Sequence, residues 1–507
     1  MKIILDSPIN KYYVQTLGMI FFPGEHFGES EETRPDAPVL SVKTVEDEGG
    51  VKTYATVELD GKSESAEYYA EFTAERTHER TLKLSIGGAV LAASSALLGY
   101  RPAWGMMIGV RPSKVASELL DAGNSKTRVK KILNTDYLVI PKKAALATNI
   151  ALTEKSIVGE PSPKDCSVYI SIPFCPTRCT YCSFVSYTSK RLLSLIPEYL
   201  EKLKRDIADN FAIINRLGLR VRTLYIGGGT PTILTEAQLR DLLGFITTQT
   251  DVSALDEYTL EAGRPDTINA EKFAVARELG VTRVSVNPQS LCEDVLCGVG
   301  RSHTVDEFYT AYDIAKSSGI RTVNVDLIAG LPGDNFRMFS KTMDEIIRLD
   351  PENITVHTFC VKKSAEVLRQ NSHIYSARGG DVGKCVDYSQ IKTEQAGYIP
   401  YYMYRQKNTV GNYENVGFSK PSYEGLYNIY MMEEIHSIFA AGAGAVGKLV
   451  DNTGNCCNKR EIERLFHQKY PYEYLRDDFS ASAFEEKLFE AEEAFKLDDK
   501  NAEAENE

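Results

Sequence analysis

The 507-residue sequence predicts an α/β fold centred on an open, partial (β/α)6 barrel over residues 166–360. Strand-like apolar runs alternate with helical patterns six times in this segment, and such alternation is typical of a parallel sheet with right-handed crossovers. Three clustered cysteines and a run of three glycines each follow one of these strands. Because ligands bind at the carboxyl ends of strands in such folds, we expect a functional site there.

The composition is that of a globular protein, with 43% hydrophobic and 25% charged residues. The net charge of −12 argues against a nucleic-acid partner, and ten cysteines are too sparse for a secreted disulfide scaffold. The N-terminal apolar run is too short for a signal peptide and meets Asp6 too early. The longest apolar stretch, residues 87–98, is shorter than the ~20 residues of a membrane span. We therefore expect a cytoplasmic protein without a membrane span.

Residues 1–158 are expected to form an α+β accessory domain. Its strands are predicted at residues 3–5, 39–45, 51–59 and 66–72, with a turn at Asp60-Gly61, and a helix at residues 78–98. The only tryptophan, Trp104, lies between Arg101 and Arg111, each of which precedes a proline. These arginines could form an exposed anion site, but a packing cluster that seats this domain on the next is favoured. The Pro- and Ser-containing composition of residues 159–165, GEPSPKD, predicts a linker.

The six strands of the barrel are expected at residues 168–172, 223–226, 258–261, 283–287, 323–328 and 354–359. The helices between them are expected at about 192–216, after Thr235, near Asn269, after Thr304 and at about 336–348. Thr235 with Gln238 and Thr304 with Glu307 have the spacing of capping boxes. Residues 361–480 form a tyrosine-rich α+β region expected to cover the substrate, and 481–507 an acidic helix and tail without a function.

The loop after the first barrel strand carries Cys175, Cys179 and Cys182 in a C-x3-C-x2-C spacing. Thiolates are the ligands of iron–sulfur clusters, which usually take four. Three would leave one iron of a four-iron cluster open to another ligand. A zinc site would need a fourth nitrogen or sulfur ligand, and a disulfide would leave one thiol unpaired. The spacing therefore favours a cluster.

This loop resembles that of the radical S-adenosylmethionine (SAM) superfamily. The resemblance implies a [4Fe-4S] cluster whose open iron binds the amino and carboxylate groups of SAM, and an electron that splits SAM to give a 5′-deoxyadenosyl radical. The glycine run YIGGGTPT (225–232), at the end of the second strand, matches a further motif of this superfamily. TLEAGRP (259–265) and RVSVNPQS (283–290) end the third and fourth strands, GRSHT (300–304) precedes the fourth helix, and the fifth strand reads NVDLIAGLPG (324–333).

The ordered set is similar to the oxygen-independent coproporphyrinogen III oxidase (dehydrogenase) family. WG…G-RP-K at 104–114 and YYMYRQKN…GNYENVG at 401–417 resemble its long, HemZ-type branch. The resemblance implies that the cysteines ligate the cluster and that Tyr169 and Arg301 act in catalysis. It implies SAM contacts for Tyr169, Tyr181, Gly228, Gly229, Thr230, Glu261, Gln289, Arg301 and Asp326.

Three of these residues also have simpler interpretations. Glu261 could be a surface glutamate in a salt bridge, Asp326 could cap a helix, and Gln289 could satisfy backbone groups.

The family resemblance implies oxidative decarboxylation of coproporphyrinogen III to protoporphyrinogen IX in anaerobic haem biosynthesis. A low-potential donor such as flavodoxin or ferredoxin would supply the electron. A flat tetrapyrrole with four carboxylates needs aromatic walls and cations. The C-terminal region offers both, although tyrosines at this density could equally pack a core: Tyr398, Tyr401, Tyr402, Tyr404, Arg405, Lys407 and Lys420.

One position departs from the oxidase pattern. The best-characterised oxidases carry a further cysteine two residues past the third ligand, where this chain has Phe184. The same ending occurs in a haem-chaperone branch of the family. The sequence therefore leaves two alternatives open, a haem-binding chaperone without oxidase activity and a radical SAM methyltransferase that degrades haem.

Overall fold

The computed structural model describes residues 1–22, 37–182, 184, 186–360, 380–406, 409–450 and 462–476. They fall into two compact units. Unit 1 comprises residues 1–155, 357–390 and 403–416, and unit 2 comprises residues 156–356, 391–402 and 417 onward. Lys407 and the predicted acidic helix at 481–507 lie outside the described residues. The domain boundaries drawn from the sequence stay a prediction.

Unit 1 begins with a four-stranded sheet in the order β1-β2-β3-β4. β1 is parallel to β2, and the other pairs are antiparallel. Asp60 and Gly61 both have positive φ, 50° and 73°, as the predicted hairpin turn requires. All four strands are confirmed close to their expected bounds: β1 (Lys2–Asp6), β2 (Val39–Glu46), β3 (Gly50–Leu59) and β4 (Lys62–Glu71).

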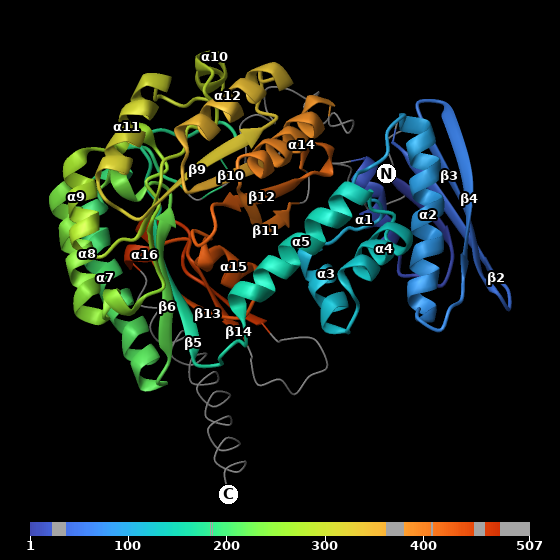
Figure 1. Cartoon of the computed structure of the whole chain (residues 1–507), viewed down its shortest axis with the longest axis horizontal. Coiled ribbons are helices and arrows are strands. Elements are labelled where there is room, and N and C mark those ends of the chain that lie inside the picture. The colour runs from blue at the N-terminus through green and yellow to red at the C-terminus, as the bar shows by residue number, and fades with distance from the viewer. Residues whose placement is uncertain are drawn as a thin grey trace, which may run out of the picture. The chain divides into compact units, whose positions relative to one another are not determined.

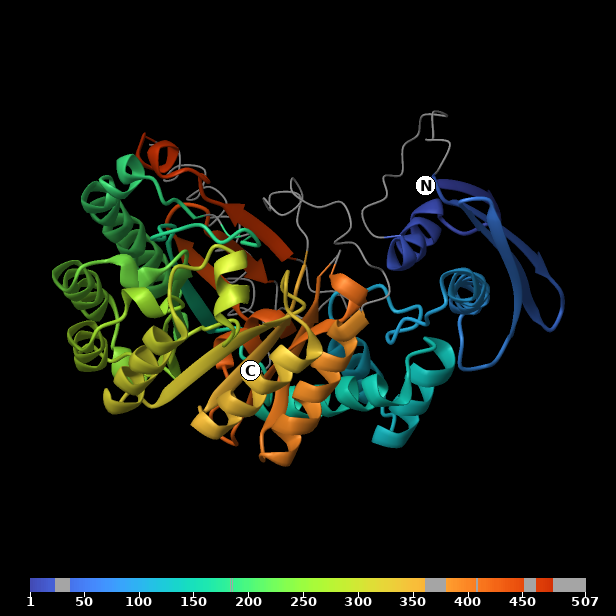
Figure 2. The same cartoon turned by 90° about the horizontal axis from the view of Figure 1, so that it is seen from above.

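The predicted helix α2 (His78–Leu98) packs on β3 and β4, where Figure 2 shows it beside the sheet. Thr77 caps its first turn by accepting from the Arg80 N–H, and Gly99, with a φ of 72°, ends it. The helix is long and apolar enough to cross a membrane, but 67% of its apolar window is buried within the protein. In this structure α2 is therefore the core helix of its unit.

Four helices of unit 1 were not predicted: α1 (Lys11–Phe21), α3 (Pro112–Asp121), α4 (Lys126–Asp136) and α5 (Pro141–Val158).

A buried ion cluster joins α5 to C-terminal sequence within unit 1. The Lys143 side chain is 1% exposed, and its Nζ donates to Glu414 and, at 3.1 Å, to Asp387 Oδ1. Burial disfavours the charged lysine, but the two carboxylates outweigh it, so the pKa of Lys143 is raised. Trp104, fully buried, donates its Nε1–H to Glu414 Oε2 at 2.7 Å. The packing role of Trp104 is confirmed, but its partner lies in the C-terminal region rather than in the barrel.

An eleven-stranded sheet contains the six predicted barrel strands, in the order β11-β12-β10-β9-β8-β7-β6-β5-β13-β14-β15. Strands β5 to β9 pair in parallel in chain order, as expected of successive βα units. The six predicted strands are β5 (Asp165–Ile172), β6 (Arg220–Gly228), β7 (Glu257–Leu260), β8 (Arg283–Ser285), β9 (Thr322–Ala329) and β10 (Asn353–Thr358).

Five C-terminal strands extend this sheet, which the sequence did not predict. They are β11 (Ile399–Arg405), β12 (Glu414–Ser419), β13 (Ser437–Ala441), β14 (Val446–Val450) and β15 (Ile462–Phe466). β13 pairs in parallel with β5, and Ser167 on β5 lies 3.0 Å from the ring of His436. The sheet thus continues beyond β5 instead of ending there.

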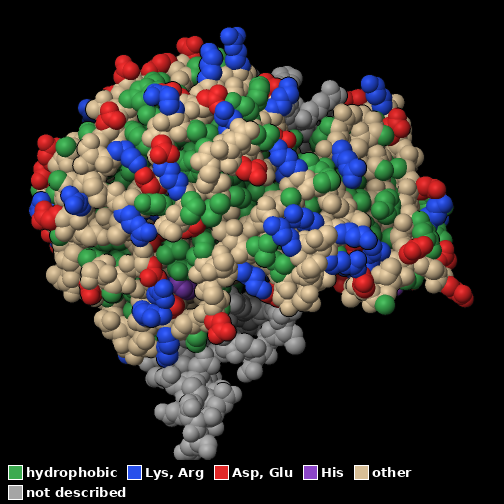
Figure 3. Space-filling view, viewed as in Figure 1, with side chains coloured by type: hydrophobic (Ala, Val, Ile, Leu, Met, Phe, Trp, Pro, Cys, Tyr) green, Lys and Arg blue, Asp and Glu red, His purple; other side chains and the backbone are tan. Residues whose placement is uncertain are grey.

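The helices of unit 2 flank its strands, and Figure 1 shows α7, α8, α9 and α11 outside them. Both predicted capping boxes are confirmed, at Thr235 with Gln238 and at Thr304 with Glu307. Figure 3 shows Lys and Arg interspersed with Asp and Glu over the visible face of this unit. The helices between the barrel strands are α6 (Lys190–Leu193), α7 (Ile196–Arg216), α8 (Glu236–Gln249), α9 (Ala270–Glu278), α10 (Glu293–Gly298), α11 (Val305–Ser317) and α12 (Phe336–Leu349). The C-terminal helices are α14 (Gly380–Gln395), α15 (Leu426–Glu433) and α16 (Pro471–Arg476).

Candidate cofactor site

The predicted site residues of unit 2 gather at the carboxyl ends of strands β5 to β9. The cysteine loop leaves β5 and is fixed by its own backbone. The Cys175 N–H donates to the Tyr187 carbonyl at 3.1 Å, and the Tyr187 N–H donates back to Pro173 at 2.9 Å. Thr180 donates its N–H to the Val299 carbonyl at 3.0 Å. Both ends of the loop are therefore anchored.

The three predicted thiols lie close to one another. Cys175 and Cys179 are buried, and Cys182 is partly exposed. Burial raises the pKa of Cys175 to about 11, and the neighbouring thiols Cys182 and Cys179 raise it further, while Thr230 and Arg264 oppose the shift. Among the described residues no group of three or more His, Cys, Asp or Glu side chains forms a ready-made metal site. The thiols are thus neighbours of the right chemistry for a cluster, but they are not arranged as metal ligands in this structure.

Arg264, which sequence reasoning missed, supports this loop. Its Nη1–H donates to Thr177 Oγ1 at 3.0 Å and lies 3.8 Å from Cys179 Sγ. Nε and Nη2 form a bidentate pair with Asp266, and Nη2 also donates to Ser302. A cation here fits a site whose thiolate ligands bring negative charge. The sequence could have indicated Arg264, because it belongs to the motif TLEAGRP and follows the predicted Glu261 by three residues.

The glycine run at the end of β6 is required by close contacts. A Cβ at Gly229 would lie 2.5 Å from the Phe174 carbonyl oxygen, and one at Gly227 would lie 2.6 Å from Glu261 Oε2. Gly228 has a φ of 108°. The N–H groups of Gly229 and Thr230 donate to Ile172 and Phe174. Because these N–H groups serve the loop, a backbone contact from Gly229 or Thr230 to a ligand must use the carbonyl oxygens.

Glu261 follows β7 and is not a surface glutamate in a salt bridge. Burial, assisted by the charge of Asp326, raises its pKa to about 8, although the Gly228 N–H favours the carboxylate. In the described part of the chain it forms no ion pair. The charge of Glu261 also contributes to raising the pKa of three nearby tyrosines, Tyr169, Tyr225 and Tyr427. A carboxyl group in this setting is available to a polar ligand.

Asp326 lies inside β9 and caps no helix. Its Oδ2 accepts from Asn287 at 2.9 Å, its Oδ1 accepts from Asn324 at 2.7 Å, and its N–H donates to Asn287 Oδ1 at 3.1 Å. The two asparagines, which were not predicted, hold this carboxylate in a fixed orientation.

Gln289 has a left-handed backbone conformation, which is unusual for a residue other than glycine. It is 9% exposed, its φ is 67°, and its N–H and carbonyl bond to Asp326 and Ile328. A left-handed conformation costs a residue with a Cβ about 1–2 kcal/mol. Its side-chain Oε1 is buried and has no hydrogen-bond partner among the residues that the structure describes. The side chain therefore does not serve the backbone, and a buried unpaired acceptor is ready to take a donor from a ligand.

Arg301 connects the cysteine loop to two strand ends. Its Nη1 donates to the Tyr181 hydroxyl at 3.0 Å, and its Nη2 donates to the carbonyls of Asn287 and Gly263 at 2.6 and 3.0 Å. Its Nε donates to His303 Nδ1 at 3.3 Å. Since a guanidinium has five N–H groups, one is left over. The geometry makes Arg301 first a positioning residue for Tyr181, and its SAM contact stays a prediction.

Three tyrosines face Glu261. Tyr169 on β5 pairs in register with Tyr225 on β6, and Tyr427 comes from α15. Their ring centroids are 6.1, 6.3 and 4.8 Å apart. No hydrogen bond joins their hydroxyls to the described residues. Tyr225 and Tyr427 were not predicted; only the position of Tyr225 before the glycine run could have indicated it.

Three of the four tyrosines considered as tetrapyrrole walls are core residues. Tyr398, Tyr401 and Tyr402 are buried, and the first two donate their hydroxyls to the Pro351 carbonyl and to Asn353 Oδ1. Tyr404 shares a hydrogen bond with His357. Among the predicted cations, Arg405 is buried in unit 1 and Lys420 pairs with Asp350 at 2.7 Å. Dense tyrosine spacing here reflects packing.

Residues 169–346 match the sequence family described as the Radical SAM superfamily. The chain is 37% identical over 377 residues to the "oxygen-independent coproporphyrinogen-III oxidase-like protein HemZ" of Bacillus subtilis (strain 168), covering 73% of this chain and 74% of that protein. The chain belongs to the HemZ family of radical SAM proteins. Its cofactors are accordingly a [4Fe-4S] cluster and SAM.

Other relatives of this HemZ-family chain differ in their named function. It is 29% identical over 329 residues to the "heme chaperone HemW" of Bacillus subtilis (strain 168), covering 64% of this chain and 82% of that one. It is 33% identical over 212 residues to the "oxygen-independent coproporphyrinogen III oxidase" of Pseudomonas aeruginosa, covering 41% and 44%. The similarity to HemZ establishes the family of the chain, but these relatives do not decide between an oxidase and a chaperone.

The HemZ-family site leads to a first prediction. Glu261→Ala should weaken SAM binding by about 1–3 kcal/mol, because hydrogen bonds at a buried polar site would be left unmade. The measurement is equilibrium SAM binding to the anaerobic, cluster-loaded protein, with iron content determined in parallel. Glu278→Ala, which removes an exposed glutamate paired with Arg240, is the control and should change neither value. An unchanged SAM affinity in Glu261→Ala would remove Glu261 from the site.

Proposed function

We propose that this protein catalyses the oxidative decarboxylation of coproporphyrinogen III to protoporphyrinogen IX in a reducing, cytoplasmic compartment. In that reaction each of two propionate side chains gives a hydrogen atom to the radical and one electron to an electron acceptor, releases CO2 and becomes a vinyl group. The bound cluster and SAM supply the radical chemistry that removes the hydrogen. A low-potential electron carrier is the proposed partner.

The observation that carries this proposal is Gln289. Its left-handed backbone and its buried Oε1, which has no partner among the described residues, are both energetically unfavourable. Such strain at a strand end, beside Glu261 and Asp326, is expected where a ligand must be held in one orientation for chemistry. A protein that only carried haem would have less need of this set.

We assign roles to the site residues on the same basis. Cys175, Cys179 and Cys182 would ligate the cluster, and Arg264 beside Cys179 would offset its negative charge. Glu261 would accept from the ribose hydroxyls of SAM, and Gln289 and Asp326 would contact its other polar groups. Arg301 would hold Tyr181 at the edge of the site.

The tyrosines Tyr169, Tyr225 and Tyr427 would supply the apolar surface that excludes water from the reacting groups. They replace the C-terminal tyrosines in this role, because those are used in packing. Their unbonded hydroxyls remain free to contact polar edges of the bound molecules.

A haem chaperone is the second candidate function. Two observations favour it: the identity to HemW and the presence of Phe184 where the best-characterised oxidases have a cysteine. It would use the same cluster and SAM site but would transfer haem without turnover.

The deciding experiment mixes the anaerobic, cluster-loaded protein with SAM, dithionite and coproporphyrinogen III, and follows CO2 and vinyl porphyrin. A parallel mixture contains haem instead. Vinyl product supports the oxidase, and haem transfer without turnover supports the chaperone. Haem loss with a methylated linear tetrapyrrole would indicate haem degradation. SAM cleavage without vinyl product contradicts the proposal.

A second prediction concerns Phe184. Its side chain is 67% exposed, and it follows the third cysteine by two residues. Phe184→Cys should change the rate of vinyl formation by less than about tenfold, or ~1.4 kcal/mol in the barrier, because an exposed side chain next to the loop does not build the site. Phe184→Ala separates loss of the ring from gain of a thiol. Activity that exists only in Phe184→Cys would refute the oxidase assignment for the natural chain.

A further inference from the structure

Arg405 is a buried cation that pairs with no carboxylate in the part of the chain that the structure describes. It ends β11 in unit 1 and is 4% exposed. Its Nη1 donates to the Met107 carbonyl at 2.6 Å, and its Nη2 donates to Asn412 Oδ1. Its Nε is buried and has no partner. Within the described residues no carboxylate lies within ion-pair distance of this guanidinium, although buried charges are normally paired.

The local charge is not balanced by neighbouring groups. The charge of Glu414 favours the cationic form of Arg405, but this carboxylate already accepts hydrogen bonds from Lys143 and Trp104. Burial lowers the pKa of Arg405 to about 10, so the side chain stays cationic at neutral pH. The ring of Trp104 lies 5.7 Å from its guanidinium carbon, and a ring face supplies only part of the missing compensation.

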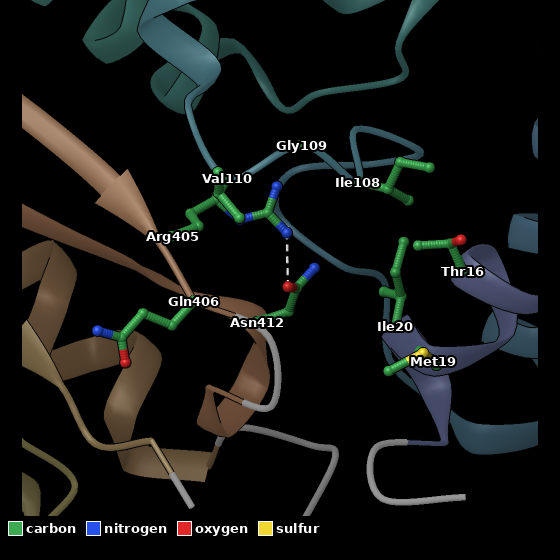
Figure 4. Close-up of a pocket in the computed structure, with 9 residues that line it drawn as sticks. All are labelled: Thr16, Met19, Ile20, Ile108, Gly109, Val110, Arg405, Gln406 and Asn412. Atoms are coloured by element: carbon green, nitrogen blue, oxygen red, sulfur yellow. Dashed lines mark hydrogen bonds between the residues drawn. The ribbon is translucent and has the colours of Figure 1, made fainter. Parts of the chain in front are cut away.

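A small pocket adjoins this cation (Figure 4). Its volume is about 50 Å³. Since one water needs on the order of 10–15 Å³ by the same measure, the pocket holds a group of roughly three to five heavy atoms. Its polar lining residues are Thr16, Arg405, Gln406 and Asn412, and the others are Met19, Ile20, Ile108, Gly109 and Val110.

Asn412 supplies a second unused donor to this pocket. Its Oδ1 accepts from Arg405, which fixes the orientation of the amide, and its Nδ2 is buried without a partner. Figure 4 shows this nitrogen turned toward the side where Ile20 and Thr16 lie, whereas the amide of Gln406 points away. The φ of Asn412 is 58°, a conformation that asparagine tolerates better than most residues. Two orphaned donors therefore belong to one pocket.

We propose that this pocket binds a carboxylate carried on a short aliphatic stem. One uncompensated cation calls for one negative charge, and the donors of Arg405 and Asn412 suit carboxylate oxygens. Met19, Ile20, Ile108 and Val110 offer apolar contact to the stem. A phosphate would bring more charge than one guanidinium offsets. The carboxylate belongs either to a free short-chain acid or to a propionate side chain of a tetrapyrrole; the second source rests on the proposed function.

Trp104 provides a direct signal for occupancy. It is the only tryptophan of the chain and is stacked near Arg405. Sodium propionate is titrated into the cluster-loaded full chain while tryptophan fluorescence is followed, with sodium chloride at equal ionic strength as reference. We expect a saturable change with propionate and none with chloride. The absence of a saturable change with propionate would overturn the proposal.

Asn412→Asp tests the site without removing the buried arginine. The new carboxylate keeps the acceptor for Arg405, replaces the free donor and supplies the missing charge within the chain. Propionate affinity should fall at least about tenfold, because a charge-assisted hydrogen bond is lost and a like charge is added. Thermal melting should show the variant to be as stable as the natural chain or more stable. Asn149→Asp, the same substitution at an exposed position of α5, is the matched control and should bind propionate normally. Equal propionate affinity in Asn412→Asp and the natural chain would refute the assignment.

The source of the carboxylate is decided by the binding of coproporphyrin III, followed through its own fluorescence. If Asn412→Asp weakens the binding of both propionate and the porphyrin, the pocket holds a tetrapyrrole side chain. If it weakens only propionate binding, the pocket serves a free acid. Neither titration requires SAM or turnover. A failed vinyl assay therefore leaves the pocket assignment standing, and a failed propionate titration leaves the oxidase assignment standing.

Discussion

Lys143→Met is expected to lower the free energy of unfolding of unit 1 by about 3–5 kcal/mol, the range for removing one partner of a buried ion pair. Lys143 is the only cation that pairs with Glu414 among the described residues, and both side chains are inaccessible to solvent. Without it, Glu414 would keep the Trp104 N–H but no ion-pair partner among the described residues. Urea unfolding followed by Trp104 fluorescence measures the change directly, because this tryptophan bonds to the affected carboxylate.

The neighbouring lysine provides the control. Lys142 pairs with the same Asp387 at 3.3 Å, but its side chain is 35% exposed. Lys142→Met should therefore cost less than about 1 kcal/mol. The double variant Lys143→Met/Glu414→Gln should recover much of the lost stability, because the unpaired charge is removed with its partner. Equal losses in Lys142→Met and Lys143→Met would show that burial of the pair is not the cause.

Cys179→Ser is expected to abolish the cluster, with iron content and brown visible absorbance falling to background. SAM cleavage should disappear with it, because a serine hydroxyl is a poor substitute for a thiolate ligand. Iron analysis and absorbance spectra of anaerobically reconstituted protein measure the effect. The fold should survive, because the loop is fixed by backbone hydrogen bonds that do not involve the Cys179 side chain.

Cysteines outside the loop serve as controls for this loss. Cys292 precedes α10 and Cys166 lies in the core of β5, and the sequence gives neither a ligand role. Cys166→Ser and Cys292→Ser should keep the cluster, as should Cys360→Ser. If one of these three lost the cluster while Cys179→Ser retained it, the ligand assignment would be wrong.

Local signals explain what the sequence predicted well. The capping boxes at Thr235 and Thr304 involve residues three positions apart, so their geometry is contained in the sequence itself. The same holds for Asn269, which caps α9, and for the Asp60-Gly61 turn. Ligands bind at strand ends in parallel sheets, and the family motifs at these ends indicated Glu261, Gln289 and Asp326. The structure brings the three residues together, and their contact with a ligand stays a prediction.

Long-range pairings explain what was missed. Trp104 and Glu414 are 310 positions apart, and no spacing rule connects them. Tyr427 reaches the cofactor site from α15, so only the folded chain brings it beside Tyr225. The φ of Gln289 has no signature in a side chain that usually avoids positive φ. The packing of Tyr398 and Tyr401 likewise depends on acceptors supplied by distant backbone and Asn353.

β5 is synthesised well before β13, the strand that pairs with one of its edges. Ser167 and His436 are 269 positions apart, and a ribosome that adds about 5–20 residues per second covers this distance in roughly 13–54 s. Throughout that interval the strand that leads into the cysteine loop has one open edge, and such edges are prone to aggregation. Arrival of β13 closes it.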